Sequence, residues 1–268
     1  MTAEAKSVRR PAARTAPGQN TNWWVEPVAV AIGFTLFVIY SSWSVFLGNC
    51  AHTGLTGSCG THPWEQGPYL SPYFSPLLKI GIWPLSSAIL VAWIPLGFRA
   101  TCYYYRKAYY RAFFWDPPAC AVAEGRHRKY TGERRLPWIL NNLHRFFLYL
   151  ALVILVVLWY DTINAFHYRN GLYIGIGSAI MLLNVVLLTM YTFSCHALRH
   201  FVGGNVDCFS CVRGGQARRG LWGLVTRVNP FHGNFAWASL ISVACVDIYI
   251  RLVSSGAFGS CFGAHTGC

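Results

Sequence analysis

Residues 171–194 read GLYIGIGSAIMLLNVVLLTMYTFS, a run long and apolar enough to cross a lipid bilayer as one helix. The chain continues at residues 195–211 with CHALRHFVGGNVDCFSC. This second stretch holds two histidines four residues apart, two glycines and a Cys-x-x-Cys motif. A candidate metal site therefore follows a membrane span without a break, where lipid is expected to meet water.

The composition of the whole chain favours a membrane protein. Of its 268 residues, 54% are hydrophobic and only 12% are charged, whereas a soluble domain usually carries about 25% charged residues. Windows of about 20 apolar residues predict five spans, at residues 26–48, 75–98, 138–164, 172–197 and 232–254. We therefore expect an all-α, polytopic membrane protein built as a bundle of five transmembrane helices.

The basic residues predict the orientation of this bundle. Most of the 22 Lys and Arg residues lie in the first 25 positions and in the loops at 99–137 and 198–231. Since cytoplasmic loops carry an excess of Lys and Arg, we expect the N-terminus in the cytoplasm and the C-terminus outside. Residues 1–25 are interpreted as a flexible basic tail and residues 26–268 as one membrane domain. Topology thus accounts for the net charge of +13, and nucleic acid is not expected as a partner.

Four of the ten cysteines are expected outside the cell, at Cys50, Cys59, Cys261 and Cys268. An oxidising exterior permits disulfides, and the two short loops suggest Cys50–Cys59 and Cys261–Cys268. The sequence leaves three pairings open. Free thiols, or an outer metal site with the histidines of the same loops, are further alternatives.

The inner cluster can present four metal ligands. His196 and His200 are four residues apart at the end of a helix, so their rings share one face. The glycines that follow let the chain turn back, and Cys208 and Cys211 can offer both thiolates to one metal. Three residues expected at the same depth could replace one of these ligands: Cys195, His144 and His232.

Several interpretations of this cluster are open. A Rieske-like [2Fe–2S] cluster takes two cysteines on one iron and two histidines on the other, which raises its potential above that of an all-cysteine cluster. A structural zinc site with two cysteines and two histidines fits the spacing equally well. The residues could also bind no metal, since the Rieske phrases Cys-x-His and Cys-x-x-His are absent. Haem b is disfavoured, because the first two predicted spans contain no histidine.

Polar residues within the spans and aromatic residues near the inner surface are further candidates. Asp161 ends the third span, while Asp247 and Arg251 lie four residues apart in the fifth and can pair on one face. Ionisable groups within a span are costly and often functional, so an outer quinone pocket or proton route competes with a simple ion pair. The candidates for an inner quinone headgroup are Trp23, Trp24, Arg99, Tyr103 and His232, although most such aromatics form interfacial belts.

Five spans with a redox cluster on the inner side resemble the membrane-anchor subunit of succinate dehydrogenase or fumarate reductase. The pattern is most similar to the cytochrome b-type, single-chain, five-helix anchors of actinobacteria such as mycobacteria. The motifs behind the resemblance are HRFF at 144–147, CHALRH at 195–200 and the Cys-x-x-Cys motif. It implies a multi-pass protein of the plasma membrane that binds an iron–sulfur subunit and, through it, a flavoprotein.

The resemblance also implies a role in the respiratory chain. Succinate oxidation by the flavoprotein would be coupled to reduction of a membrane quinone at this subunit, which itself has no assigned catalytic residue. Typical five-helix anchors hold two b haems on histidines of the first four spans, and this chain lacks those of the first two. The Cys/His cluster is therefore expected to replace them, as a [2Fe–2S] centre in preference to zinc. A di-haem anchor and a non-redox scaffold with zinc are the alternatives, and assembly into a higher oligomer stays open.

Overall fold

The protein is almost entirely helical in the part that the computed structural model describes, namely residues 22–46, 69–76, 78, 86–115, 138–168, 171–172 and 174–254. The long helices are α1 (Val25–Phe46), α3 (Ile89–Ala100), α4 (Tyr103–Phe114), α5 (His144–Asn164), α6 (Ile176–Phe193), α8 (Gly215–Val228) and α9 (His232–Ser254). Short helical turns are η2 (Pro72–Phe74), η4 (Trp138–Leu143), α7 (His196–Arg199), η5 (His200–Gly204), η6 (Phe209–Cys211) and η7 (Asn229–Phe231). A two-stranded hairpin, β1 (His167–Tyr168) with β2 (Gly171–Leu172), joins α5 to α6.

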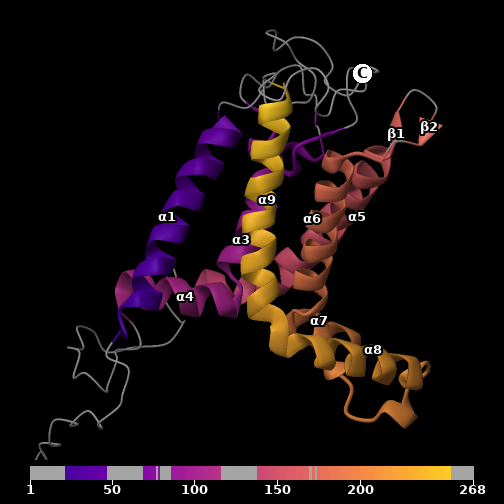
Figure 1. The fold of residues 1–268 in the computed structure, drawn as a ribbon. Helices are drawn as coiled ribbons and strands as arrows, with labels where there is room; N and C mark the ends of the chain where they lie inside the picture. Colours follow the sequence, from indigo (N-terminus) through magenta and orange to yellow (C-terminus); the bar gives the residue numbers. More distant parts are fainter. Residues whose placement is uncertain are drawn as a thin grey trace, which may run out of the picture.

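Four helical stretches are long and apolar enough to cross a membrane: Val25–Phe46, Ile139–Asn164, Ile176–Phe193 and Gly215–Val253. The last stretch bends between α8 and α9, so that α9 alone runs along the bundle (Figure 1). These helices confirm an all-helical, polytopic membrane protein. The predicted second span is described only in its C-terminal part, as the 12-residue helix α3. Five spans and the orientation of the termini therefore stay predictions.

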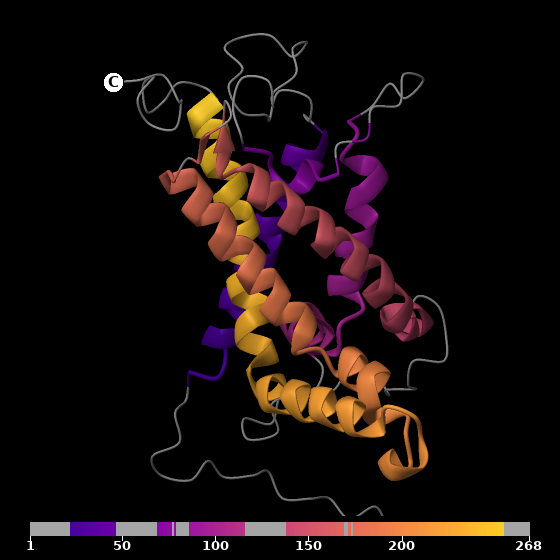
Figure 2. The same ribbon diagram turned by 90° about the vertical axis from the view of Figure 1, so that its right-hand side faces the viewer.

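The outer surface of the bundle is apolar, as lipid contact requires. In α1 only Pro27 and Ser44 are buried, while Leu36 and Ile39 are each 62% exposed. An apolar surface of this extent is not stable in water but is covered by acyl chains in a bilayer. The helices α3, α5, α6 and α9 pack side by side behind it (Figures 1 and 2).

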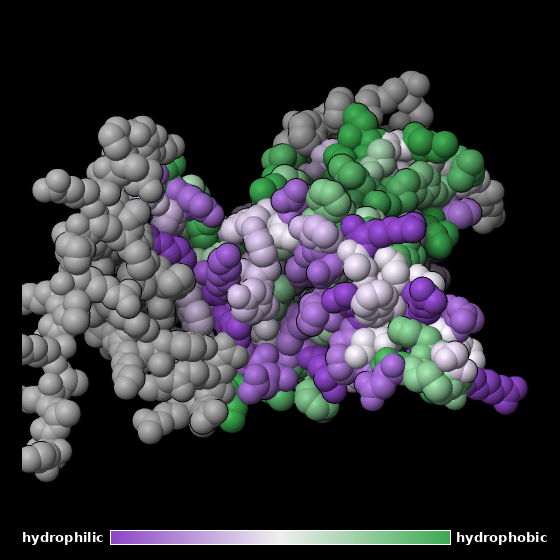
Figure 3. Space-filling view, turned by 90° about the horizontal axis from the view of Figure 1, so that it is seen from below, coloured by the Kyte–Doolittle hydropathy of each residue, from purple (hydrophilic) through white to green (hydrophobic). Residues whose placement is uncertain are grey.

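Two helices lie across one end of the bundle rather than along it (Figures 1 and 2). These are α4 and α8, and they occupy the predicted loops at 99–137 and 198–231. Their sequences, YYYRKAYYRAFF and GQARRGLWGLVTRV, mix basic residues with large apolar ones and are too short and polar to span a membrane. Hydropathy therefore marks them as loops, although they fold as surface helices. Hydrophilic residues gather at this end of the molecule (Figure 3), which we call the basic end.

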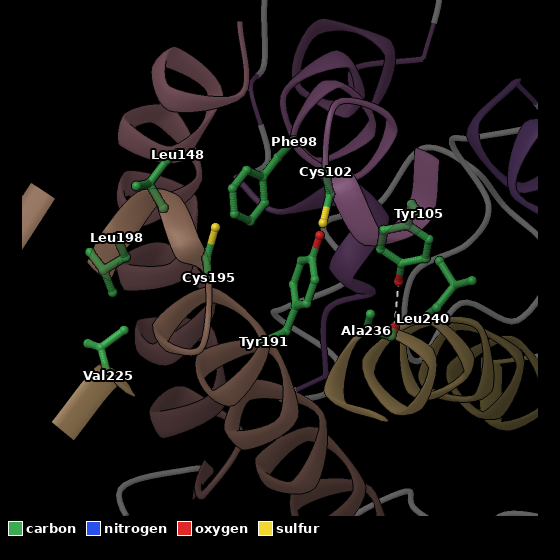
Figure 4. Close-up of a cluster of buried hydrophobic side chains, with 10 residues drawn as sticks. All are labelled: Phe98, Cys102, Tyr105, Leu148, Tyr191, Cys195, Leu198, Val225, Ala236 and Leu240. Atoms are coloured by element: carbon green, nitrogen blue, oxygen red, sulfur yellow. Dashed lines mark hydrogen bonds between the residues drawn. The ribbon is translucent and has the colours of Figure 1, made fainter. Parts of the chain in front are cut away.

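The main core lies just inside the basic end. Ten buried residues form it, drawn from α3, α4, α6, α7, α8, α9 and the start of α5: Phe98, Cys102, Tyr105, Leu148, Tyr191, Cys195, Leu198, Val225, Ala236 and Leu240 (Figure 4). Buried aromatic rings and thiols from so many elements fix how the surface helices sit against the bundle. The candidate site is built on this core.

A polar cluster ties α1 to α9 near the opposite end. Asp247 is fully buried and accepts hydrogen bonds from Tyr40 Oη (2.5 Å), Ser44 Oγ (2.9 Å) and Ser71 Oγ. Arg251 Nε donates to the same carboxylate at 2.8 Å, and its Nη2 donates to the carbonyl and hydroxyl of Ser44. The charge of Asp247 is thus neutralised and hydrogen-bonded, which a buried carboxylate requires.

Replacing Asp247 with alanine should destabilise the fold by about 1–3 kcal/mol, because it leaves buried hydroxyl groups without their acceptor and the partly buried Arg251 without its carboxylate. The measurement is the thermal unfolding midpoint in detergent. Asp161→Ala is the matched control, since the hydrogen bond that Asp161 accepts comes from one side chain, Ser75, and its loss should cost less. Equal midpoints for Asp247→Ala and the unmodified protein would show that this cluster does not hold α1 to α9.

Candidate metal centre

Two cysteine–histidine pairs meet at the basic end. His144 Nε2 lies 3.2 Å from Cys195 Sγ, and His232 Nε2 lies 3.3 Å from Cys102 Sγ. Both cysteines are 2% exposed, and all four side chains line one cavity. Four metal-binding side chains that are far apart in the sequence thus share one buried place.

Each of the four residues stands where a helix begins. Cys102 precedes α4 and Cys195 precedes α7, both with extended backbone angles (φ −63°, ψ 130° and φ −67°, ψ 137°). His144 and His232 are the first residues of α5 and α9. Because span ends share one depth, residues at these positions are brought to one level of the bundle.

The histidine tautomers follow from the hydrogen bonds of two hydroxyl groups. Thr101 Oγ1 donates to the carbonyl of Gly97 at 2.6 Å and lies 3.0 Å from His144 Nδ1. Its proton is therefore already used, and the hydroxyl oxygen must accept from Nδ1–H. His144 Nε2 then carries the lone pair, and that lone pair faces Cys195.

The second histidine repeats this arrangement. Ser194 Oγ donates to the carbonyl of Tyr191 at 3.1 Å and lies 2.8 Å from His232 Nδ1. An acceptor that fixes the outer ring nitrogen is the usual support of a metal-binding imidazole, and a hydroxyl oxygen supplies it here. Aromatic rings hold the imidazole planes: Phe98 stacks on His144 (4.8 Å, 3°) and Tyr191 on His232 (4.9 Å, 15°).

The buried thiol of Cys195 is protonated when no metal is bound. Burial raises its pKa to about 12, and the neighbouring thiol of Cys102 adds to the shift. A metal ion must therefore displace the proton as it binds. A positive charge stands close by, because Arg99 lies over the Tyr191 ring at 4.8 Å and donates to Ser239 Oγ and the carbonyl of Ala236.

One buried polar atom at the site has no hydrogen-bond partner among the described residues. It is the hydroxyl oxygen of Tyr191. Leaving such a group unpaired costs about 1–3 kcal/mol. The site is therefore incomplete with protein atoms alone.

A cavity of about 840 Å³ opens beside the cluster at the basic end. The four clustered residues lie in its wall together with two arginines and two further histidines: Arg106, Arg145, His196 and His200. A partner subunit or a small molecule can reach the edge of the cluster through this cavity.

The predicted ligand set is only partly brought together. Cys195, His144 and His232, the three reserve residues, lie in the cluster, and Cys102 joins them unpredicted. His196 and His200 line the cavity, whereas Cys208 and Cys211 form a disulfide with each other in η6. In the described part of the chain, no three His, Cys, Asp or Glu side chains converge as ligands of a single ion.

The position of Cys102 relative to a predicted span could have indicated that it lies near Cys195. Cys102 lies shortly after the second predicted span, and Cys195 lies close to the end of the fourth. Its place within an aromatic, basic stretch without other ligand types hid this equivalence.

The predicted quinone residues lie in three different places. Trp23 packs edge-on against Trp115 at 5.7 Å, beneath the guanidinium of Arg111, and Trp24 is half-exposed. Tyr103 and His232 line the cavity, while Arg99 points into the core. The predicted outer disulfide residues, Cys50, Cys59, Cys261 and Cys268, lie outside the described residues.

These features define a class: a helical membrane subunit with a buried thiol and imidazole cluster at its basic end. The chain belongs to the family of the actinobacterial succinate dehydrogenase subunit SdhC, whose sequence profile matches residues 25–256. It is also similar to a chain of the Mycobacterium smegmatis Sdh1 complex in the apo form, with 37% sequence identity and a TM-score of 0.78. That match covers 94% of this chain and 95% of the other. Comparison with curated protein sequences gives no match.

Alkylation can distinguish a disulfide from metal ligation at Cys208 and Cys211. In membranes prepared without reductant, both should stay unmodified by a maleimide until a phosphine reductant is added, as mass spectrometry of peptides would report. Cys195 should resist the reagent at pH 7 with or without reductant, because it is buried and protonated. Modification of Cys208 after treatment with a metal chelator alone would instead identify it as a ligand.

Proposed function

We propose that this succinate dehydrogenase subunit relays electrons to a membrane quinone through a [2Fe–2S] cluster held by Cys102, Cys195, His144 and His232. One observation carries the proposal: two buried thiols and two Nε2 lone pairs share one site, with both Nδ1 atoms bonded to hydroxyl groups. Two cysteines and two histidines are the donors of a Rieske-type cluster. When bound, such a cluster supplies a one-electron carrier of raised potential.

The chain's own residues prepare this site. Thr101 and Ser194 accept hydrogen bonds from the Nδ1–H groups and so hold the imidazoles with Nε2 turned toward the cysteines. Phe98 and Tyr191 stack on the imidazoles and restrict rotation of the rings. Arg99 supplies positive charge that offsets the two thiolates, since it makes no ion pair with a carboxylate of the described residues.

The cavity supports docking of the electron donor at this end. Its basic wall and exposed Tyr103 offer the arginine and tyrosine side chains that anchor protein interfaces. An iron–sulfur subunit that carries a flavoprotein would then stand within reach of the cluster, and quinone would be reduced near the same surface. In the full complex this surface would be covered.

Two alternatives are less well supported by the geometry. A single zinc ion needs four donors converging on one point, and no three do so among the described side chains. A b haem needs open space in front of each imidazole. Here a cysteine sulfur stands 3.2–3.3 Å from each Nε2, and a haem bound by the two histidines would leave both buried thiols unused.

Replacing a ligand should remove the cluster without unfolding the bundle. In the purified complex, Cys102→Ser or Cys195→Ser should lose the iron, the acid-labile sulfide and the EPR signal of the reduced [2Fe–2S] centre of this subunit. Cys208→Ser is the matched control and should keep all three, because Cys208 lies outside the cluster. Succinate oxidation by an artificial dye should persist while quinone reduction falls.

The opposite result would identify the Cys-x-x-Cys motif as the source of the cysteine ligands. If Cys208→Ser loses the iron while Cys102→Ser keeps it, the cluster is held by the first-named set of Cys208, Cys211, His196 and His200. Zinc without iron in the unmodified complex would exclude the relay altogether.

A further inference from the structure

The hydroxyl of Tyr191 is the one buried polar atom of the candidate centre without a partner among the described residues. Tyr191 itself is 1% exposed. Its hydroxyl points toward the sulfur of Cys102 (Figure 4), although no hydrogen bond joins the two groups in this site. A neutral thiol is a weak acceptor, so this direction has no evident use in the metal-free site.

The ring of Tyr191 is held by three aromatic rings and one guanidinium group. It stacks on His232 and meets Phe98 (5.5 Å) and Tyr105 (5.9 Å) edge to face. The guanidinium of Arg99 covers it at 4.8 Å. A side chain confined in this way cannot turn its hydroxyl toward another acceptor. The packing around the ring therefore fixes the direction of the hydroxyl.

We propose that Tyr191 donates a hydrogen bond to the sulfur of Cys102 when that sulfur is a metal-bound thiolate, and thereby raises the reduction potential of the cluster. The inference rests on the cluster proposed above and adds a tuning residue to it. A thiolate is a much stronger hydrogen-bond acceptor than a thiol, so metal binding would give the unpaired hydroxyl a partner.

The direction of the effect follows from charge. The added electron makes the coordinated sulfur more negative, so a hydrogen bond to it stabilises the reduced state more than the oxidised state. Hydrogen bonds to the sulfurs are among the factors that set the potential of an iron–sulfur centre. Tyr191 acts on the iron through Cys102 and is therefore a positioning residue.

A buried water is the competing partner for this hydroxyl. A small cavity of about 50 Å³ lies beside Tyr191 and Arg99, with mostly apolar walls from α3, α5 and α6. If a water there accepts the hydrogen bond, the potential should not depend on the hydroxyl.

The test is a redox titration of the complete succinate dehydrogenase complex carrying Tyr191→Phe, followed by EPR. At a fixed ambient potential the ratio of reduced to oxidised cluster should fall about tenfold, which is a midpoint about 59 mV lower for one electron. Tyr105→Phe is the matched control. It also removes a buried hydroxyl, but that hydroxyl accepts from Arg99 and donates to the carbonyl of Ala236 instead of pointing at a sulfur.

Each result has one meaning. A lower midpoint in Tyr191→Phe alone, at normal iron content, supports the proposal. An unchanged midpoint, an equal shift in Tyr105→Phe, or loss of iron from Tyr191→Phe overturns it, the last because the residue would then serve assembly. Absence of iron from the unmodified subunit would reject the proposed cluster itself, which is a separate result.

Discussion

The hydrogen bond between each histidine and its neighbouring hydroxyl is the constraint on which the candidate centre depends. The hydroxyl groups of Thr101 and Ser194 already donate hydrogen bonds to backbone carbonyls, so both must accept from Nδ1–H. This forces both Nε2 lone pairs toward the cysteines. Polar groups that are largely buried must find hydrogen-bond partners within the protein, and the two ring nitrogens find them in these hydroxyl groups.

The same requirement organises the rest of the molecule. At the far end, Asp247 is stable in the bundle because Arg251 and three hydroxyl groups surround it. Between the two polar clusters the helices are apolar and face lipid. At the basic end, α4 and α8 turn across the bundle (Figure 2), because their arginines cannot enter the membrane while their apolar faces need the core.

The family match and the geometry of the site answer different questions about this subunit. The match to the actinobacterial SdhC family and the 37% identity to a chain of the Mycobacterium smegmatis Sdh1 complex define the kind of subunit. The hydrogen bonds identify which side chains could carry its chemistry. A cluster at this position would lie at the edge of a cavity with a basic wall, where a soluble donor and a lipid-soluble acceptor can both approach.

The amino-acid sequence was enough to predict a polytopic helical membrane protein, because a span needs only a local run of about 20 apolar residues. It also predicted a redox site on the side of the basic residues, with His144, Cys195 and His232 as reserve ligands. That Cys102 lies with these three residues, and that Cys208 and Cys211 lie apart from them, was visible only in the packed fold. The physical reason is that these four side chains come from four different helix starts, and their meeting depends on how the helices pack. No spacing along the chain encodes that packing.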